Sequence, residues 1–232
     1  MQWTAFRHQF RHHDVPELGT GMAACNRDRG LGHRYTPHTM RPKLKVLIAE
    51  SLSGDDLYAG RREGVALAEI LNLAGLSCTS MVVHGTKHLK KALRQADSID
   101  ANVFHLSCHG NDEGIQLLSG EEIAWDVLAD LCQRYTEPNR AIVLSCCQGG
   151  VYGLTREIKE RPKRVGWVFG CEGDVEFTDA CICWAMLYRQ ISRSGLEPGA
   201  MKEAIRLMNG MSDAGFNYRR WTGKSYKRHP SK

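Results

Sequence analysis

The sequence predicts an α/β fold of three layers, helix over sheet over helix, with a mostly parallel central sheet. Short apolar runs typical of buried parallel strands alternate along the chain with segments of helical periodicity. Of the 232 residues, 42% are hydrophobic and 25% are charged, as in globular domains rather than disordered chains. Strands that alternate with helices form parallel sheets covered on both faces.

The first apolar run, residues 45–49, predicts a buried strand, and the polar, Gly-containing residues 51–60 predict a loop. A helix is predicted next, because Leu67, Ile70, Leu71 and Ala74 repeat at i, i+3, i+4 and i+7. Further predicted strands cover residues 78–83, 103–107, 115–118, 141–145 and 165–170. Further predicted helices cover residues 87–96, 125–131, 180–192 and 200–209.

The domain is predicted to span residues 42–216, between two basic extensions. Residues 1–41 carry six Arg, three acids and five of the ten His, without a periodic apolar face, which predicts a disordered N-terminal extension. Residues 217–232 carry six Lys or Arg and no acid, which predicts a solvated C-terminal tail. Because three aromatic residues lie among these cations, nucleic acid is a less favoured alternative partner.

Cysteine usage indicates a reducing, cytoplasmic setting with free thiols. The nine Cys are odd in number and lack the spacing of a secreted disulfide framework, and the first residues lack a signal peptide's apolar core. No apolar run approaches about 20 residues, so no membrane partner is expected. The Cys181-x-Cys183 pair is too tight for a zinc site and has no second pair, so we expect neither metal nor other cofactor.

Two Gly-flanked turns follow predicted strands and present a histidine and a cysteine. His109 precedes Gly110 after the strand at 103–107, and Cys147 follows the strand at 141–145. Open parallel sheets bind ligands beyond the carboxyl ends of their strands. If these two strands pair at the usual spacing of about 4.8 Å, the imidazole and the thiol face one cleft.

A thiol beside an imidazole is suited to nucleophilic catalysis. An ordinary Cys has a pKa near about 8.5, so a nucleophilic thiolate needs a base, and His109 can supply one to Cys147. The backbone N–H groups of Gly110 and Cys147 are candidate oxyanion donors, each worth about 3 kcal/mol in a transition state. Cys146 is the rival nucleophile, but adjacent residues point to opposite faces, so only one of the two thiols faces His109.

These segments resemble the caspase-like cysteine peptidases. His109 to Ile115 is similar to the His-Gly-x-x-x-Gly turn of that clan, and Leu144 to Gly149 is similar to its Cys segment. Within the clan the sequence most resembles the CHAT-domain family, bacterial peptidases related to separase, over about residues 43–210. Cys146 stands where that family has Ala, and the family's Trp-Pro pair after the fifth strand is missing.

The resemblance implies a caspase-like three-layer fold and a cysteine endopeptidase with Cys147 as nucleophile. It implies protein or peptide substrates, a role in regulated proteolysis, in bacteria often in defence or signalling, and a separate sensor or activator protein. A catalytically silent protein-interaction module on the same fold is the alternative function.

An acidic cluster after the fifth predicted strand is a candidate specificity site. It contains Glu172, Asp174 and Glu176, of which we expect Glu172 and Asp174 to bind a basic side chain of the substrate. Asp55 and Asp56 would serve equally, and a solvated acidic loop is the alternative interpretation.

Overall fold

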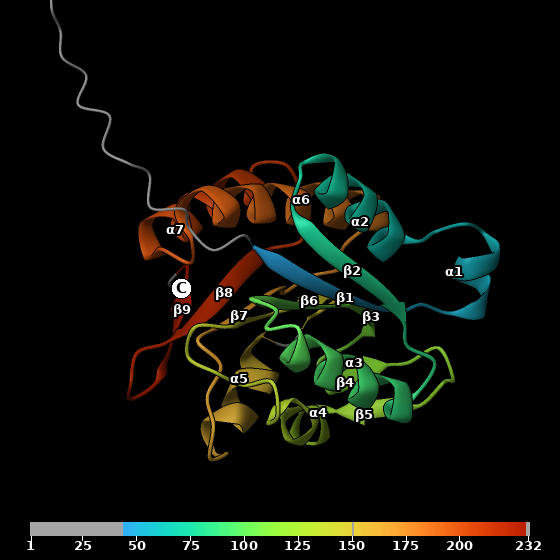
Figure 1. Ribbon diagram of the computed structural model, residues 1–232, viewed down its shortest axis with the longest axis horizontal. Coiled ribbons are helices and arrows are strands. Elements are labelled where there is room, and N and C mark those ends of the chain that lie inside the picture. The colour runs from blue at the N-terminus through green and yellow to red at the C-terminus, as the bar shows by residue number, and fades with distance from the viewer. Residues whose placement is uncertain (1–43, 150, 231–232) are drawn as a thin grey trace, which may run out of the picture. The chain divides into compact units, whose positions relative to one another are not determined.

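The computed structural model describes residues 44–149 and 151–230, which form seven helices and a sheet of nine strands (Figure 1). The main path of the sheet has the order β2-β1-β3-β6-β7-β8-β9. Its parallel strands are β1 (Lys45–Ser51), β2 (Ser77–Val82), β3 (Val103–Gly110), β6 (Ala141–Ser145) and β7 (Trp167–Cys171). The antiparallel strands β8 (Phe216–Trp221) and β9 (Tyr226–His229) extend it at one edge. The predicted mostly parallel sheet is confirmed.

Helices cover both faces of this sheet, which confirms the three layers (Figure 1). One face carries α2 (Glu63–Leu73), α6 (Phe177–Ser194) and α7 (Pro198–Asn209). The other carries α3 (Thr86–Ser98), α4 (Trp125–Cys132) and α5 (Val151–Lys159). Successive strand residues serve alternate cores, so Val46 and Ile48 pack on the α2 side whereas Leu47 and Ala49 pack on the α3 side.

Two small elements lie beyond the carboxyl ends of the central strands. The strand β4 (Gly114–Gln116) pairs with the end of β3 and with β5 (Glu122–Ala124), forming a short antiparallel extension. The helix α1 (Gly54–Tyr58) follows β1 and projects from the layers (Figure 1). The sequence predicted a loop where α1 lies, and it did not predict α5 or β5.

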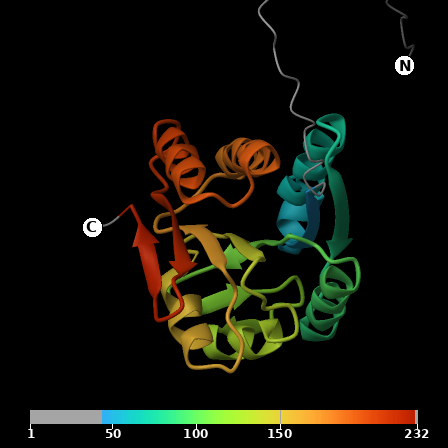
Figure 2. The ribbon, with the colours of Figure 1, turned by 60° about the vertical axis from the view of Figure 1, so that its left-hand side comes forward.

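The C-terminal boundary differs from the sequence prediction, because residues 216–229 are strands rather than a tail. Figure 2 shows the β8–β9 hairpin, in red, at the sheet edge. Tyr218 is buried, with its ring 5.1 Å from Trp167 and 5.5 Å from Phe169 between centroids. The Tyr226 hydroxyl donates to the Val165 carbonyl at 2.7 Å. These aromatic rings, which suggested stacking on nucleic acid, pack within the domain instead.

The predicted N-terminal extension, residues 1–41, lies outside the described residues. Within the part that the structure describes, no helix is both long enough and apolar enough to cross a membrane.

The chain passes so close to itself before β7 that only glycine fits at position 166. A Cβ on Gly166 would lie 1.9 Å from the backbone carbonyl oxygen of Pro138. We expect Gly166→Ala to lower the free energy of unfolding by about 1–3 kcal/mol, measured by urea denaturation at pH 7. Gly199→Ala in α7, where no atom lies within 4 Å of the added Cβ, is the control and should be neutral or slightly stabilising. Equal stability of the two variants would contradict this packing.

Candidate active site

The pairing of β3 with β6 brings the two predicted turns to the same end of the sheet. These strands are parallel neighbours, with Ser107 opposite Ser145. His109 and Cys147 each follow two residues later, so they stand at equivalent levels. His109 is still within β3, on the same face as Ser107, which directs its side chain toward the α2–α6 side, whereas Cys147 lies in the turn just beyond the end of β6. The strand pairing on which the predicted cleft depends is present.

Residues 175–177, where the β7–α6 loop meets the start of α6, contact both side chains. The Cys147 Sγ lies 3.9 Å from the Val175 carbonyl oxygen. The His109 ring meets the Phe177 ring edge to face, with 6.3 Å between centroids. The His109 side chain is 40% exposed and Cys147 is half-buried, so both groups are accessible. The imidazole and the thiol therefore border the same three residues, at the junction between this loop and α6.

The two turns also pack directly against each other. A Cβ on Gly110 would lie 3.0 Å from the Cys146 Sγ and 3.2 Å from the Cys147 carbonyl oxygen, so a side chain there would push the turns apart. The chain reverses immediately after Cys147, because Gln148 adopts a left-handed φ of 49° that non-glycine residues rarely take. This sharp reversal presents residue 147 at the tip of the turn.

Both predicted oxyanion donors are available in this arrangement. The Asn111 N–H donates to the Gly114 carbonyl across the β3–β4 turn at 3.0 Å. Ladder bonds alternate along an antiparallel pair, so the next pair, Gly110 with Ile115, leaves the Gly110 N–H pointing away from β4. Within the described residues, no hydrogen bond occupies the Cys147 N–H. Their roles in catalysis stay predictions.

A carboxylate that the sequence analysis considered only for specificity binds the histidine. Asp56, on α1, lies 2.6 Å from the His109 Nε2 through its Oδ2. The Ser53 hydroxyl donates to the same Oδ2, and the other oxygen, Oδ1, accepts from the Arg61 Nε at 2.8 Å. Ser53 caps the first turn of α1 by accepting from the Asp56 N–H. The Ser-x-x-Asp spacing is a helix-start signal that would have revealed α1, although not its contact with His109.

These contacts keep Asp56 ionised. Burial alone would raise its pKa, but hydrogen bonds from Ser53, His109 and Arg61, together with the charge of His109, outweigh burial and lower the pKa to about 2. A carboxylate at Nε2 favours the tautomer that carries its proton on that nitrogen. The His109 Nδ1 then has a free lone pair with which to accept a proton.

The rival thiol is on the other face of the sheet. Cys146 is only 2% exposed and lies beside Cys108 in the core under α4 and α5. Its hydrogen bond with Cys108 and its burial raise the pKa of Cys146 well above the usual range. This geometry favours Cys147 over Cys146 as the nucleophile. His105, in the middle of β3, is fully buried, and its Nδ1 lies 2.7 Å from the Tyr188 hydroxyl.

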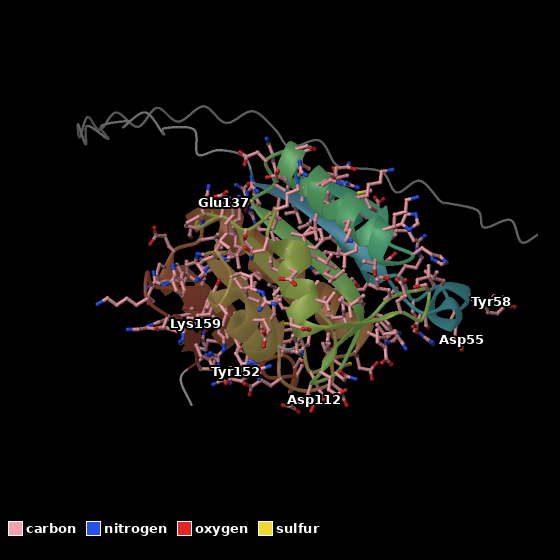
Figure 3. The ribbon with its side chains drawn as sticks, turned by 90° about the horizontal axis from the view of Figure 1, so that it is seen from below. Asp55, Tyr58, Asp112, Glu137, Tyr152 and Lys159 are labelled. Atoms are coloured by element: carbon pink, nitrogen blue, oxygen red, sulfur yellow. The ribbon has the colours of Figure 1, made fainter. Side chains whose placement is uncertain are left out.

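The two predicted specificity acids are in different surroundings. Glu172 forms an ion pair with Arg228 at 2.7 Å and lines a cleft of about 260 Å³ that also holds Arg156 and Arg219. Asp112 and Tyr152, labelled in Figure 3, line the same cleft. Asp174 is exposed and directly precedes Val175, the residue whose carbonyl contacts Cys147. Of the two acids, Asp174 is thus adjacent in sequence to the loop residue at the thiol.

Comparison with known proteins identifies no family by sequence. No protein-family model matches the chain, and no curated protein matches it. Among solved structures, the Arg-specific cysteine proteinase gingipain R is similar over 72% of this chain, with 10% identity and a TM-score of 0.49. The complex of the Porphyromonas gingivalis RgpB pro- and mature domains also covers 72%, with 10% identity and a TM-score of 0.48. The aligned parts make up 42% and 43% of those chains, less than half their length. The CHAT resemblance stays a prediction.

The ion-paired state of Asp56 should make stability depend on pH. The lowered pKa stabilises the folded state above the ordinary value of 3.8, and this stabilisation is lost as the pH falls toward 2. We expect Asp56→Asn to cost about 2 kcal/mol of unfolding free energy at pH 6, and progressively less between pH 4 and pH 2. Urea denaturation across this pH range measures the difference.

Asp55→Asn is the matched control. Asp55 is exposed at the outer end of α1 and labelled in Figure 3, so its replacement should leave the pH profile unchanged. A pH-independent difference between wild type and Asp56→Asn would contradict the proposed electrostatics.

Proposed function

We propose that the chain is a caspase-like cysteine endopeptidase in which Cys147 is the nucleophile, His109 the proton carrier and Asp56 the group that orients the imidazole. One observation carries the proposal. A buried carboxylate holds one nitrogen of an accessible imidazole, and residues 175–177, where the β7–α6 loop meets α6, contact both that imidazole and an accessible thiol. This is the arrangement by which a base is oriented toward a nucleophile.

The proposed reaction proceeds through an acyl-enzyme. His109 Nδ1 takes the thiol proton, and the Cys147 sulfur attacks the peptide carbonyl carbon. The oxyanion accepts hydrogen bonds from the Gly110 and Cys147 N–H groups. The imidazolium returns its proton to the leaving amine as the C–N bond breaks, which leaves a thioester. Water, deprotonated by His109, hydrolyses the thioester and releases the acid product and the free thiol.

A cleft suited to a peptide begins at the histidine. It has a volume of about 370 Å³ and runs from His109 and Gly110 along β4 and β5. Within the described sheet β5 pairs only with β4, so its outer edge is open to hydrogen bonding. An extended peptide can add to such an edge through its own backbone. Protein or peptide substrates, regulated proteolysis in bacterial defence or signalling, and a separate activator protein belong to this proposal through the CHAT resemblance.

Replacing the nucleophile should abolish activity without unfolding the protein. We expect Cys147→Ala to lose all peptide cleavage and all labelling by an acyloxymethyl-ketone probe, because the change removes the proposed nucleophile. The matched control is Cys146→Ala, which removes the neighbouring buried thiol and should keep both properties. Cleavage of a peptide library and mass spectrometry of the labelled protein measure the outcome.

Full activity of Cys147→Ala would refute the assignment. An unlabelled, inactive wild-type protein would instead favour the catalytically silent interaction module.

Asp174 is the proposed specificity acid, since Glu172 is engaged by Arg228. We expect Asp174→Asn to lower kcat/KM for substrates with Arg or Lys before the cleaved bond by about tenfold, mainly through KM, because one attractive charge is lost. Glu172→Gln is the control and should change this ratio little. Peptides that differ only in that residue, Arg against Gln, provide the measurement. An unchanged Arg-to-Gln preference in Asp174→Asn would exclude Asp174 from the specificity site.

A further inference from the structure

A buried carboxylate bridges the two strands that carry the proposed dyad. Glu63 is the first residue of α2, and its side chain is 1% exposed. One of its oxygens, Oε2, accepts a hydrogen bond from the Ser107 hydroxyl on β3 and another from the Ser145 hydroxyl on β6, the latter at 2.9 Å. A single atom of Glu63 thus connects two neighbouring strands of the sheet.

Other buried polar groups hold this bridge in place. The Trp184 indole N–H on α6 donates to the Ser145 Oγ at 2.8 Å. His105 Nε2 lies 3.4 Å from the Glu63 Oε1, and its Nδ1 contacts the Tyr188 hydroxyl. A buried carboxylate is costly unless donors satisfy it, so a chain that keeps one gains a fixed geometry rather than simple stability. The cluster joins α2, β3, β6 and α6.

The two serines of the bridge lie two residues before the two residues of the proposed dyad. Ser107 precedes His109 by two residues, about 6.6 Å along β3 and on the same face, and Ser145, the last residue of β6, precedes Cys147 by two residues. Beyond Ser107 and Ser145 the two strands no longer pair, so the separation of the turns depends on the last linked pair.

We propose that Glu63 is a positioning residue of the peptidase, holding the ends of β3 and β6 together so that the His109 imidazole stays in proton-transfer range of the Cys147 thiol. This inference rests on the proposed function. It differs from a substrate-binding role, in which the Glu63 Oε1, an atom without a hydrogen-bond partner among the described residues, would receive a cationic side chain.

The test measures the reactivity of Cys147 toward iodoacetamide, a small reagent that needs no substrate subsite. The principal variant is Ser107→Ala, which removes one of the two hydrogen bonds to the Glu63 Oε2. We expect it to disturb the fold less than a change at a buried carboxylate. Its matched control is Ser51→Ala, which removes another buried serine at the carboxyl end of the neighbouring strand β1, where the hydroxyl donates to the Val83 carbonyl. Glu63→Gln is the second variant, and it is tested once circular dichroism has shown that it folds.

We expect Ser107→Ala to slow alkylation of Cys147 at pH 6.5 by about tenfold, because small displacements of reacting groups have large kinetic effects. The value of kcat should fall in parallel while KM stays within about twofold. Ser51→Ala should match wild type in all three measurements, and Glu63→Gln should resemble Ser107→Ala.

The outcomes separate this inference from the function on which it rests. Wild-type protein that alkylates like an ordinary thiol and cleaves no peptide would overturn both. Active wild type with unchanged alkylation and kcat in Ser107→Ala would overturn the positioning role alone. A raised KM for basic substrates with unchanged alkylation in Glu63→Gln would also overturn it, in favour of substrate binding.

Discussion

The parallel pairing of β3 with β6 is the constraint on which the candidate site depends. Its register places Ser107 opposite Ser145, and the residues that follow leave the sheet at the same level. A shift of one residue in either strand would turn every side chain beyond it to the opposite face. If β6 were shifted by one residue, Cys146 in place of Cys147 would follow the residue opposite Ser107 by two positions. The register of β3 with β6, which ends at Ser145, therefore decides which of the two thiols stands at the level of His109.

The same two strands serve different purposes on their two faces. On one face, Ser107 and Ser145 belong to the polar cluster around Glu63, and His109 and Cys147 follow them. On the other face, Cys108 and Cys146 lie in the apolar core under α4 and α5. Apolar packing on the α4–α5 face holds the ends of the two strands against the helices. Directional hydrogen bonds to Glu63 on the other face set the distance between β3 and β6. Period-two alternation allows both within one stretch of sequence.

The sequence was sufficient for features that depend on local pattern. The buried parallel strands are apolar runs, and all five predicted helices exist with boundaries within a few residues of those observed. The helix α5 escaped prediction because Gly153 lowers helix propensity at its centre. A Cβ on Gly153 would lie 2.4 Å from the Trp125 ring, so glycine there permits α5 to pack on α4. That contact joins residues far apart in sequence and leaves no local signal.

The missed strands β8 and β9 and the surroundings of the acids have a common physical origin. Cationic residues on β8 and β9 gave the hairpin the composition of a solvated tail, whereas its alternate aromatic residues pack within the domain. Once β9 is placed at the edge, Arg228 reaches Glu172 and forms an ion pair with one of the two predicted specificity acids. In the same way, Asp56 acquires its role only when α1 is brought beside β3. A charged residue's partner is decided by the fold, so composition shows only which charges exist.

The position of Asp56 couples the folding of α1 to the state of the histidine. The helix α1 has five residues, too short to persist through backbone hydrogen bonds alone. Its strongest contacts run through the Asp56 carboxylate, which accepts from Ser53, Arg61 and His109. The group that orients the imidazole is thus also the group that organises its own loop. A change that breaks the contact between His109 and Asp56 would therefore also remove one of the hydrogen bonds that hold the Asp56 carboxylate in place on α1.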